Sequence, residues 1–245
     1  MSFLRKIVRI PLFLLWFIGV TIYCRIFNRG KNAQALALDT TLVWGKVTAW
    51  ILNLKVSVVG NFDDFSGGLI VANHQSSVDT LVLASTFKIR FAPKKEMRSW
   101  PLIGALTQGN MPVWIDRSTP AKAKVSADAM SETMRNGFGM MVFPEGTTSD
   151  GKDGLLPFKS TSFQAVIDSG KNVLPVIIEY SKSSLADLQW FGHRSFLPHA
   201  WHVLGLKKIE ATVHVLDPIS PAENEDRKAL TARVYTVMNE KWRSL

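Results

Sequence analysis

A histidine and an aspartate five positions apart lie between two apolar runs in VANHQSSVDTLVL, residues 71–83. An imidazole can accept a proton from a substrate hydroxyl when a second group holds its other ring nitrogen in one tautomer. Asp79 can hold His74 in this way, because a loop between a strand end and a helix start can fold back and bring the two side chains together. The pair is a candidate general base with its orienting carboxylate. A histidine bonded only structurally at a helix N-terminus fits the same spacing.

A second candidate site follows a predicted strand in FPEGTTSDG, residues 143–151. Gly146 permits close approach of the backbone to a ligand, and the hydroxyls and amides after it can line an anion or a polar head group. Glu145 lies within the same turn. A tight turn after a strand, without any ligand, explains the pattern equally well.

Two further groups of polar side chains bear on ligand binding. Lys95 and Arg117, in the segment 93–118, predict part of a positive rim, although single lysines are more often simply solvated. His193, His199 and His202 cluster in the sequence, but no cysteine or acidic ligand joins them on a clear helix face. Zinc sites need such a defined ligand set, so no metal is expected.

The elements that position these residues alternate between short apolar runs and longer mixed segments after residue 60. Strands alternating with helices predict an α/β domain, with a layered mixed sheet flanked by helices. The expected strands are 67–73, 89–94, 111–117, 138–146, 172–180 and 208–219, the last at the sheet edge. The expected helices are 76–85, 119–137, 162–170 and a C-terminal helix within 221–245.

Composition limits the class of protein. The 245 residues suffice for one sizeable α/β domain, and the single cysteine, Cys24, excludes an internal disulfide. The formal net charge of +9 suits either nucleic acid or an anionic membrane surface. No recognised nucleic-acid motif accompanies the charge, so a membrane partner is favoured over nucleic acid.

The N-terminus carries two membrane-seeking segments. Residues 10–24 contain no charge, are flanked by basic residues, and as a helix span roughly 22 Å, less than the hydrocarbon core of about 30 Å. Residues 41–60 are mostly apolar and contain Trp44 and Trp50 with two lysines. We expect a membrane-embedded helical hairpin over 1–60 and a catalytic domain over 61–245. A cleaved signal peptide, or a short spanning helix followed by an amphipathic helix, are the alternatives.

Four blocks, in this order, resemble the bacterial 1-acyl-sn-glycerol-3-phosphate acyltransferase (lysophospholipid acyltransferase) family. They are NHQSSVD, KKEMRSWPLIG with WIDR, FPEGTTS and VLPVII. The resemblance implies a membrane-bound O-acyltransferase at the cytoplasmic face of a bacterial inner membrane. In this interpretation His74 deprotonates the hydroxyl of a lysolipid, Asp79 orients His74, and no covalent acyl-enzyme forms. The acyl donor, acyl-CoA or acyl-carrier protein, is a co-substrate, and no cofactor is implied.

The resemblance also implies binding roles and leaves the acceptor open. Enzymes acting on lysophosphatidic acid usually carry arginine where this chain has Thr148, and a hydroxyl cannot clamp a phosphate as a guanidinium does. The stretches FPEGTTSDG…LPFKS and WFGH…FLPHAW also resemble lyso-ornithine lipid acyltransferases. A catalytically silent lipid-binding scaffold on the same fold is a further alternative. The expected substrate-binding residues are Lys95, Arg117, Glu145, Gly146, Thr147 and Thr148.

Overall fold

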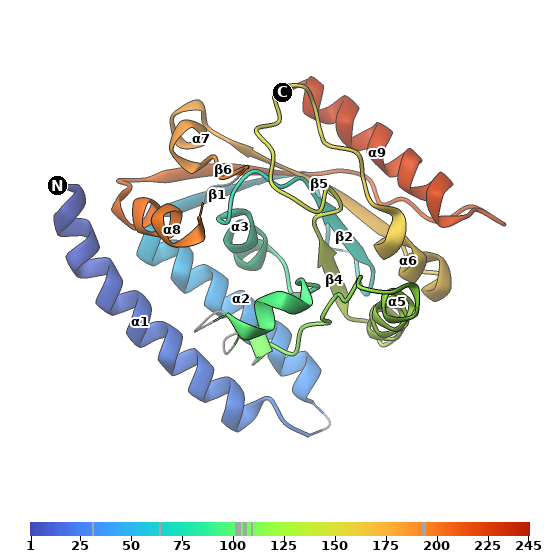
Figure 1. The fold of residues 1–245 in the computed structure, drawn as a ribbon, viewed down its shortest axis with the longest axis horizontal. Helices are drawn as coiled ribbons and strands as arrows, with labels where there is room; N and C mark the ends of the chain where they lie inside the picture. The colour runs from blue at the N-terminus through green and yellow to red at the C-terminus, as the bar shows by residue number, and fades with distance from the viewer. Residues whose placement is uncertain (31, 64, 101–103, 105–106, 109, 193–194) are drawn as a thin grey trace.

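The computed structural model describes residues 1–245 except 31, 64, 101–103, 105–106, 109 and 193–194. Across these described residues six strands form one sheet in the order β1-β6-β5-β2-β4-β3 (Figure 1). The four strands β5, β2, β4 and β3 are parallel, whereas β6 is antiparallel to β5 and parallel to β1. The predicted layered mixed sheet is therefore confirmed. The strands are β1 (Leu54–Val59), β2 (Leu69–Ala72), β3 (Ile89–Phe91), β4 (Gly139–Val142), β5 (Val173–Tyr180) and β6 (Ile209–Val215).

Helices cover both faces of the sheet. One face packs against α2, α3, α7 and α8, and the other against α5, α6 and α9. The helices are α1 (Ser2–Phe27), α2 (Ala33–Leu52), α3 (Asp79–Thr86), α5 (Pro120–Arg135), α6 (Phe163–Ser169), α7 (Lys182–Leu188), α8 (Phe196–Gly205) and α9 (Arg227–Arg243). Short 3-10 helices within the described residues include η1 (Lys95–Ser99) and η2 (Ser160–Ser162).

The strand that leads to His74 is buried on both faces. Ile70 and Ala72 of β2 point into the core beneath α3, and Leu69 and Val71 point into the core beneath α5, α6 and α9. A central parallel strand with both faces covered reads as a continuous apolar run, which explains why residues 67–73 lack polar alternation. The loop that follows β2 therefore starts from a rigid, buried strand.

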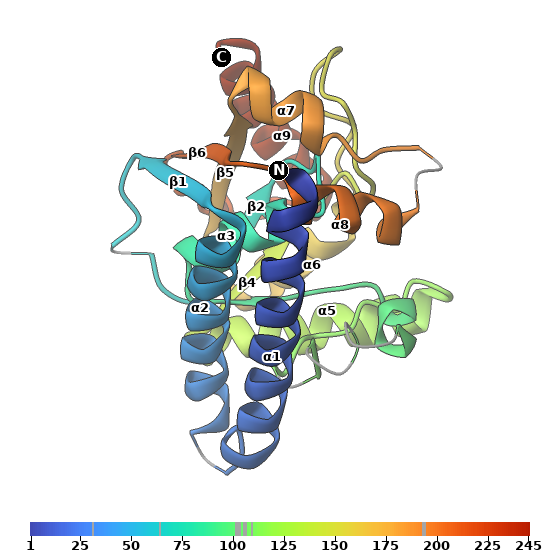
Figure 2. The same cartoon turned by 90° about the vertical axis from the view of Figure 1, so that its left-hand side faces the viewer.

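The two N-terminal helices form an antiparallel hairpin against the body of the protein (Figure 2). Both are long and apolar enough to cross a membrane by length and composition, although α2 is largely covered by the rest of the protein. Gly45 of α2 lies against Ala84 of α3, where an added Cβ would be 2.4 Å from the Ala84 carbonyl carbon. The hairpin therefore packs directly on the helix that begins at Asp79.

Three expectations about elements need correction. Residues 111–117 are not a strand and make one isolated bridge, between Ile115 and Lys94. β6 is not at the sheet edge, because β1 pairs with it along its outer side. β1 itself lies within the stretch 41–60, which was expected to be membrane-seeking throughout. The division into 1–60 and 61–245 remains a prediction. β1 lies on the N-terminal side of this boundary and is hydrogen-bonded into the sheet through β6.

Candidate active site

The loop after β2 is fixed to the neighbouring strand by Asn73. Its side-chain Nδ2 donates to the carbonyl oxygen of Ile178 at 3.0 Å, and its Oδ1 accepts from the Ile178 N–H at 2.7 Å. Asn73 is buried, so these two bonds satisfy its amide and join the end of β2 to β5. His74 therefore follows a residue that has little freedom to move.

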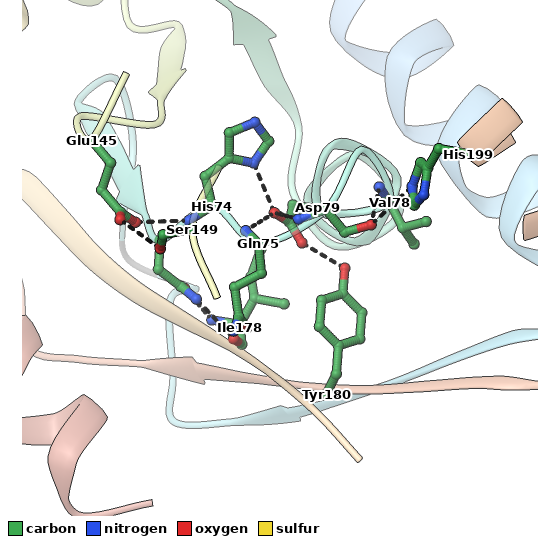
Figure 3. Close-up of polar contacts among 11 residues, drawn as sticks. His74, Gln75, Val78, Asp79, Glu145, Ser149, Ile178, Tyr180 and His199 are labelled. Atoms are coloured by element: carbon green, nitrogen blue, oxygen red, sulfur yellow. Dashed lines mark hydrogen bonds and ion pairs between the residues drawn. The ribbon is translucent and has the colours of Figure 1, made fainter. Parts of the chain in front are cut away.

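His74 and Asp79 are in direct contact, as the sequence predicted. The His74 Nδ1 lies 2.7 Å from the Asp79 Oδ2, which also accepts the backbone N–H groups of Gln75 at 2.7 Å and Ser76 at 2.9 Å (Figure 3). The Asp79 side chain is 1% exposed and that of His74 is 18% exposed. Because a carboxylate can only accept, Nδ1 is the donor, so in the neutral imidazole the other ring nitrogen, Nε2, has a lone pair on the side away from Asp79.

Tyr180 is a member of the site that sequence reasoning missed. Its hydroxyl donates to the Asp79 Oδ1 at 2.6 Å, so both carboxylate oxygens are occupied. Burial, followed by the charge of Asp79, raises the pKa of Tyr180 well above its usual value, which keeps the hydroxyl protonated as a donor. The only signal in the sequence is a polar side chain at the end of an otherwise buried strand.

The ring of His74 is also held on its flat side. Phe143, at the end of β4, stacks on it with ring centroids 3.9 Å apart and planes 8° apart. A hydrogen bond from Nδ1 and a stacked ring together restrict both rotation and tilt of the imidazole. The geometry thus presents a pre-positioned proton acceptor.

Glu145 links the second candidate site to the first. Its Oε1 accepts the His74 N–H at 2.9 Å, and its Oε2 accepts the Leu156 N–H at 3.0 Å and the Ser149 hydroxyl at 3.2 Å. Burial raises the pKa of Glu145, an effect that the bonds from Leu156, His74 and Ser149 partly oppose. The carboxylate is thus engaged by the surrounding loops, and its predicted contact with an acceptor lipid stays a prediction.

The rest of the FPEGTT turn lies beside the dyad. The Ser149 N–H donates to the His74 carbonyl oxygen at 2.9 Å, which ties the turn to the loop that carries His74. Gly146 has a φ of +75°, and an added Cβ there would be 2.6 Å from the ammonium nitrogen of Lys159. Thr147 is exposed and Thr148 is half-buried. A positive side chain thus lies over the turn, which sequence reasoning had not selected.

Lys95 and Arg117 occupy the segment that follows β3. Lys95 makes an ion pair with Asp116 at 2.9 Å, and hydrogen bonds from Ser118 together with Lys95 lower the pKa of that aspartate. Arg117 is exposed. Among the described residues, no hydrogen bond or ion pair joins either cation to the dyad. Their predicted role in binding head group or donor phosphates is therefore untested by the geometry.

The histidines of the α8 region do not form a metal site within the described ranges. His199 approaches the Ser76 hydroxyl at 3.4 Å, and His202 faces Asp187 at 3.6 Å on the surface. His193 lies outside the described residues. No group of three or more potential ligands is found in the described part of the chain, and the absence of a metal remains an expectation.

Comparison with known proteins identifies the family. The family model described as Acyltransferase matches residues 54–179, from the first residue of β1 almost to the end of β5. The chain belongs to this acyltransferase family. The matched span contains His74, Asp79, the FPEGTT turn and Asn73, and Tyr180 is the first residue beyond it.

Individual relatives support the assignment. A 1-acyl-sn-glycerol-3-phosphate acyltransferase from Neisseria gonorrhoeae is 33% identical, over 85% of this chain and 86% of its own. A lyso-ornithine lipid O-acyltransferase from Rhodobacter capsulatus is 30% identical, over 76% of this chain and 70% of its own. The crystal structure of the 1-acyl-sn-glycerophosphate acyltransferase PlsC from Thermotoga maritima has a TM-score of 0.73 at 21% identity, covering 99% of this chain and 95% of that one. The chain is thus an acyltransferase with the PlsC fold.

Proposed function

We propose that this acyltransferase transfers a fatty acyl group from a thioester donor to the sn-2 hydroxyl of 1-acyl-sn-glycerol-3-phosphate, giving phosphatidic acid. The observation that supports it is the contact of His74 with the buried Asp79, which leaves Nε2 free to accept a proton. The donor is acyl-CoA or acyl-carrier protein. The reaction takes place at the cytoplasmic face of a bacterial inner membrane, where the apolar hairpin holds the enzyme.

The reaction proceeds in two proton transfers at one nitrogen. The His74 Nε2 removes the proton of the acceptor hydroxyl as its oxygen attacks the thioester carbonyl carbon. Asp79 stabilises the imidazolium that forms, and Tyr180 and the loop amides keep the carboxylate in place. The tetrahedral intermediate then expels the thiolate, which takes the proton back from His74. The acceptor itself is the nucleophile, so no covalent acyl-enzyme is needed.

A lyso-ornithine lipid is the second candidate acceptor. Thr148 replaces the arginine usual in enzymes that act on lysophosphatidic acid, and a hydroxyl makes weaker contacts with a phosphomonoester than a guanidinium. Several relatives at 28–30% identity are named lyso-ornithine lipid O-acyltransferases. The acceptor hydroxyl of that lipid lies on a 3-hydroxy fatty acyl chain without a phosphate. The same dyad serves both acceptors.

Acyl transfer by the purified protein tests the proposal. The detergent-solubilised enzyme is incubated with labelled acyl-CoA or acyl-carrier protein, and lysophosphatidic acid and lyso-ornithine lipid are offered side by side. We expect label in phosphatidic acid and its loss in His74→Ala. Label only in ornithine lipid would keep the mechanism and change the acceptor. Folded protein without transfer to either lipid would favour the silent scaffold.

Restoring the arginine tests head-group recognition separately. If the missing guanidinium limits phosphate binding, Thr148→Arg lowers KM for lysophosphatidic acid and leaves KM for lyso-ornithine lipid unchanged. Thr148→Lys supplies charge without the bidentate fork and is the matched control. An unchanged KM for lysophosphatidic acid in Thr148→Arg would contradict a role for this position in phosphate recognition.

A further inference from the structure

The helix α8 exposes an apolar face that the proposed reaction does not use. Leu197 is 77% exposed and Trp201, one turn later, is 53% exposed. His199 and Val203 of the same helix are buried against the body of the protein. Large apolar side chains gathered on one side of a short helix point to a partner surface.

Positively charged residues of α1 fix α8 in place. The Arg5 Nε donates to the carbonyl oxygen of Gly205 at 2.8 Å, and the Arg9 Nη1 donates to those of Leu206 at 2.5 Å and Leu204 at 3.2 Å. Guanidinium groups thus satisfy the last carbonyls of α8, where the helix dipole is negative. An added Cβ at Gly205 would lie 2.4 Å from the Ser2 hydroxyl oxygen, so the two helices are in close contact.

The exposed face of α8 lies next to the first turns of α1, as Figures 1 and 2 show for the two helices. The Lys6 ammonium lies 4.7 Å from the centroid of the Trp201 ring. On the side of α1 that faces away from α8, an apolar stripe follows the helix from its first turn to its C-terminus. Its members include Leu4, Ile7, Val8, Leu15, Ile18, Ile22 and Ile26.

The opposite face of α8 reaches the catalytic loop. The His199 ring stacks on Trp190 with centroids 5.5 Å apart, and its Nε2 lies 3.4 Å from the Ser76 hydroxyl. The Ser76 N–H donates to Asp79, and the Trp190 N–H donates to the Gln75 carbonyl oxygen. One helix thus separates an exposed apolar face from the loop that carries the dyad.

The geometry points to α8, together with the first turns of α1, as a membrane contact that docks on the head-group region of an anionic bilayer. A tryptophan flanked by a lysine and arginines is typical of such an interface, where the ring lies at the level of the head groups. Arg5, Lys6 and Lys207 supply positive charge at this place, and the whole chain carries +9. The helix that contacts α8 also carries the long apolar stripe, which favours a bilayer over a protein partner. This contact goes beyond the proposed reaction and can be measured without turnover.

Site-specific fluorescence in nanodiscs tests the contact. The full-length protein in a Cys24→Ser background receives one new cysteine, labelled with a polarity-sensitive dye, and lipids with a quencher on the upper acyl chain are included. Leu197→Cys is the test position on α8, and Leu15→Cys on α1 is the reference. Val237→Cys is the matched control, since Val237 is an exposed apolar residue of α9 and this helix lies on the opposite side of the molecule from α1 and α8 (Figure 1).

The expected result is a blue shift and a loss of emission at position 197 comparable to those at position 15, with neither at position 237. The effect at position 197 weakens when phosphatidylglycerol is replaced by phosphatidylcholine or when salt is raised, because screening removes the attraction to anionic lipid. If the dye at position 197 shows no more blue shift and no more quenching than the dye at position 237, the proposal is overturned. An effect at position 197 that is identical in neutral and anionic discs overturns its electrostatic part.

Trp201→Asp provides a second measurement on an exposed residue whose replacement leaves the core intact. In the Trp201→Asp variant, the blue shift of the dye at position 197 should become smaller in anionic discs. Val237→Asp should leave that blue shift unchanged. No difference between the two variants would also overturn the proposal. Because neither readout depends on acyl transfer, failure of this inference is distinguishable from failure of the proposed function.

Discussion

At the scale of single residues, Asp79 organises the site through four hydrogen bonds to one carboxylate. Three donors converge on Oδ2 and Tyr180 donates to Oδ1. Asp79→Asn keeps the shape of the side chain but can place an amide donor where His74 needs an acceptor. The ring is then no longer held in the tautomer that protonates Nδ1, and the imidazolium loses the negative charge that stabilises it. By analogy with a buried aspartate in a Ser-His-Asp triad, we expect kcat to fall by roughly 10³–10⁴ with the fold retained. Turnover and circular dichroism measure the two effects.

A second aspartate–histidine pair provides the control for this substitution. Asp187 faces His202 at 3.6 Å on the surface, and both side chains are about half exposed. Asp187→Asn should leave kcat within a factor of about two, because exposed pairs contribute little. Equal losses of activity in the two variants would mean that the contact between Asp79 and His74 has no special role.

Glu145 gives a pH-dependent prediction at the same scale. Burial raises the pKa of this carboxyl in the folded protein, so folding favours its protonated form. Its contribution to stability is therefore greatest below the unfolded pKa of about 4.3 and is lost as the pH rises through the higher folded value. The Tm advantage of the wild type over Glu145→Gln should shrink as the pH rises through this range. Thermal unfolding in detergent over a pH series measures it, and an advantage that grows with pH would contradict the sign.

The contact between His74 and Asp79 could be predicted from sequence because it is local. His74 and Asp79 are five positions apart, and one loop brings them together. Tyr180 contributes to the same site from 101 positions further along the chain, and only the pairing of β5 with β2 places it there. Sequence spacing carries no information about such a contact. The same reason hides Lys159, which lies over Gly146 through tertiary folding alone.

At the scale of elements, the errors are at the edges of the sheet. β1 is a strand of six residues whose outer positions are mostly exposed, so its apolar and polar residues resemble the end of an interfacial helix. Only its parallel pairing with β6 distinguishes the two, and that partner is more than 150 residues away. The buried strands β2, β4 and β5 were predicted in the right places, because full burial requires an apolar run.

The packing of α2 on α3 also gives a prediction at this scale. In Gly45→Ala the new methyl would lie 2.4–2.5 Å from backbone atoms of Ala84 and Ser85, which cannot rotate away. α2 and α3 must separate, and we expect a loss of about 1–3 kcal/mol in the free energy of unfolding. A lower kcat follows, since α3 carries Asp79. Chemical or thermal unfolding and turnover measure both effects.

The matched control lies on α1. Gly19 has no atom within 4 Å of an added Cβ, so Gly19→Ala replaces a glycine in a helix by a better helix former without a clash. This variant should be unchanged or stabilised by up to about 1 kcal/mol. If Gly45→Ala were equally harmless, the close contact between the hairpin and α3 would not exist in solution.

At the scale of the whole molecule, the N-terminal hairpin is part of the fold, besides being long and apolar enough to cross a membrane. Phe17, Val20 and Cys24 of α1 share a buried cluster with Trp44 of α2 and Ala84 of α3. α2 in turn supplies Ala49 and Leu52 to the core beneath the sheet. A chain divided after residue 60 would separate side chains that pack against one another. α2 and α3 thus connect the hairpin to the core that supports the His74 loop.

Two truncations distinguish a detachable anchor from an integral hairpin. Removing residues 1–32 exposes one side of α2 but leaves every strand, so we expect a folded protein with a lower Tm and weaker vesicle binding. Removing residues 1–60 also deletes β1 and α2. β6 then becomes an edge strand without a partner on the side where β1 had been, and the side of α3 that packs on α2 becomes exposed. That chain should show no cooperative unfolding in calorimetry. Cooperative unfolding of the shorter chain, with a Tm close to that of the intact protein, would instead show that residues 61–245 fold as an independent domain.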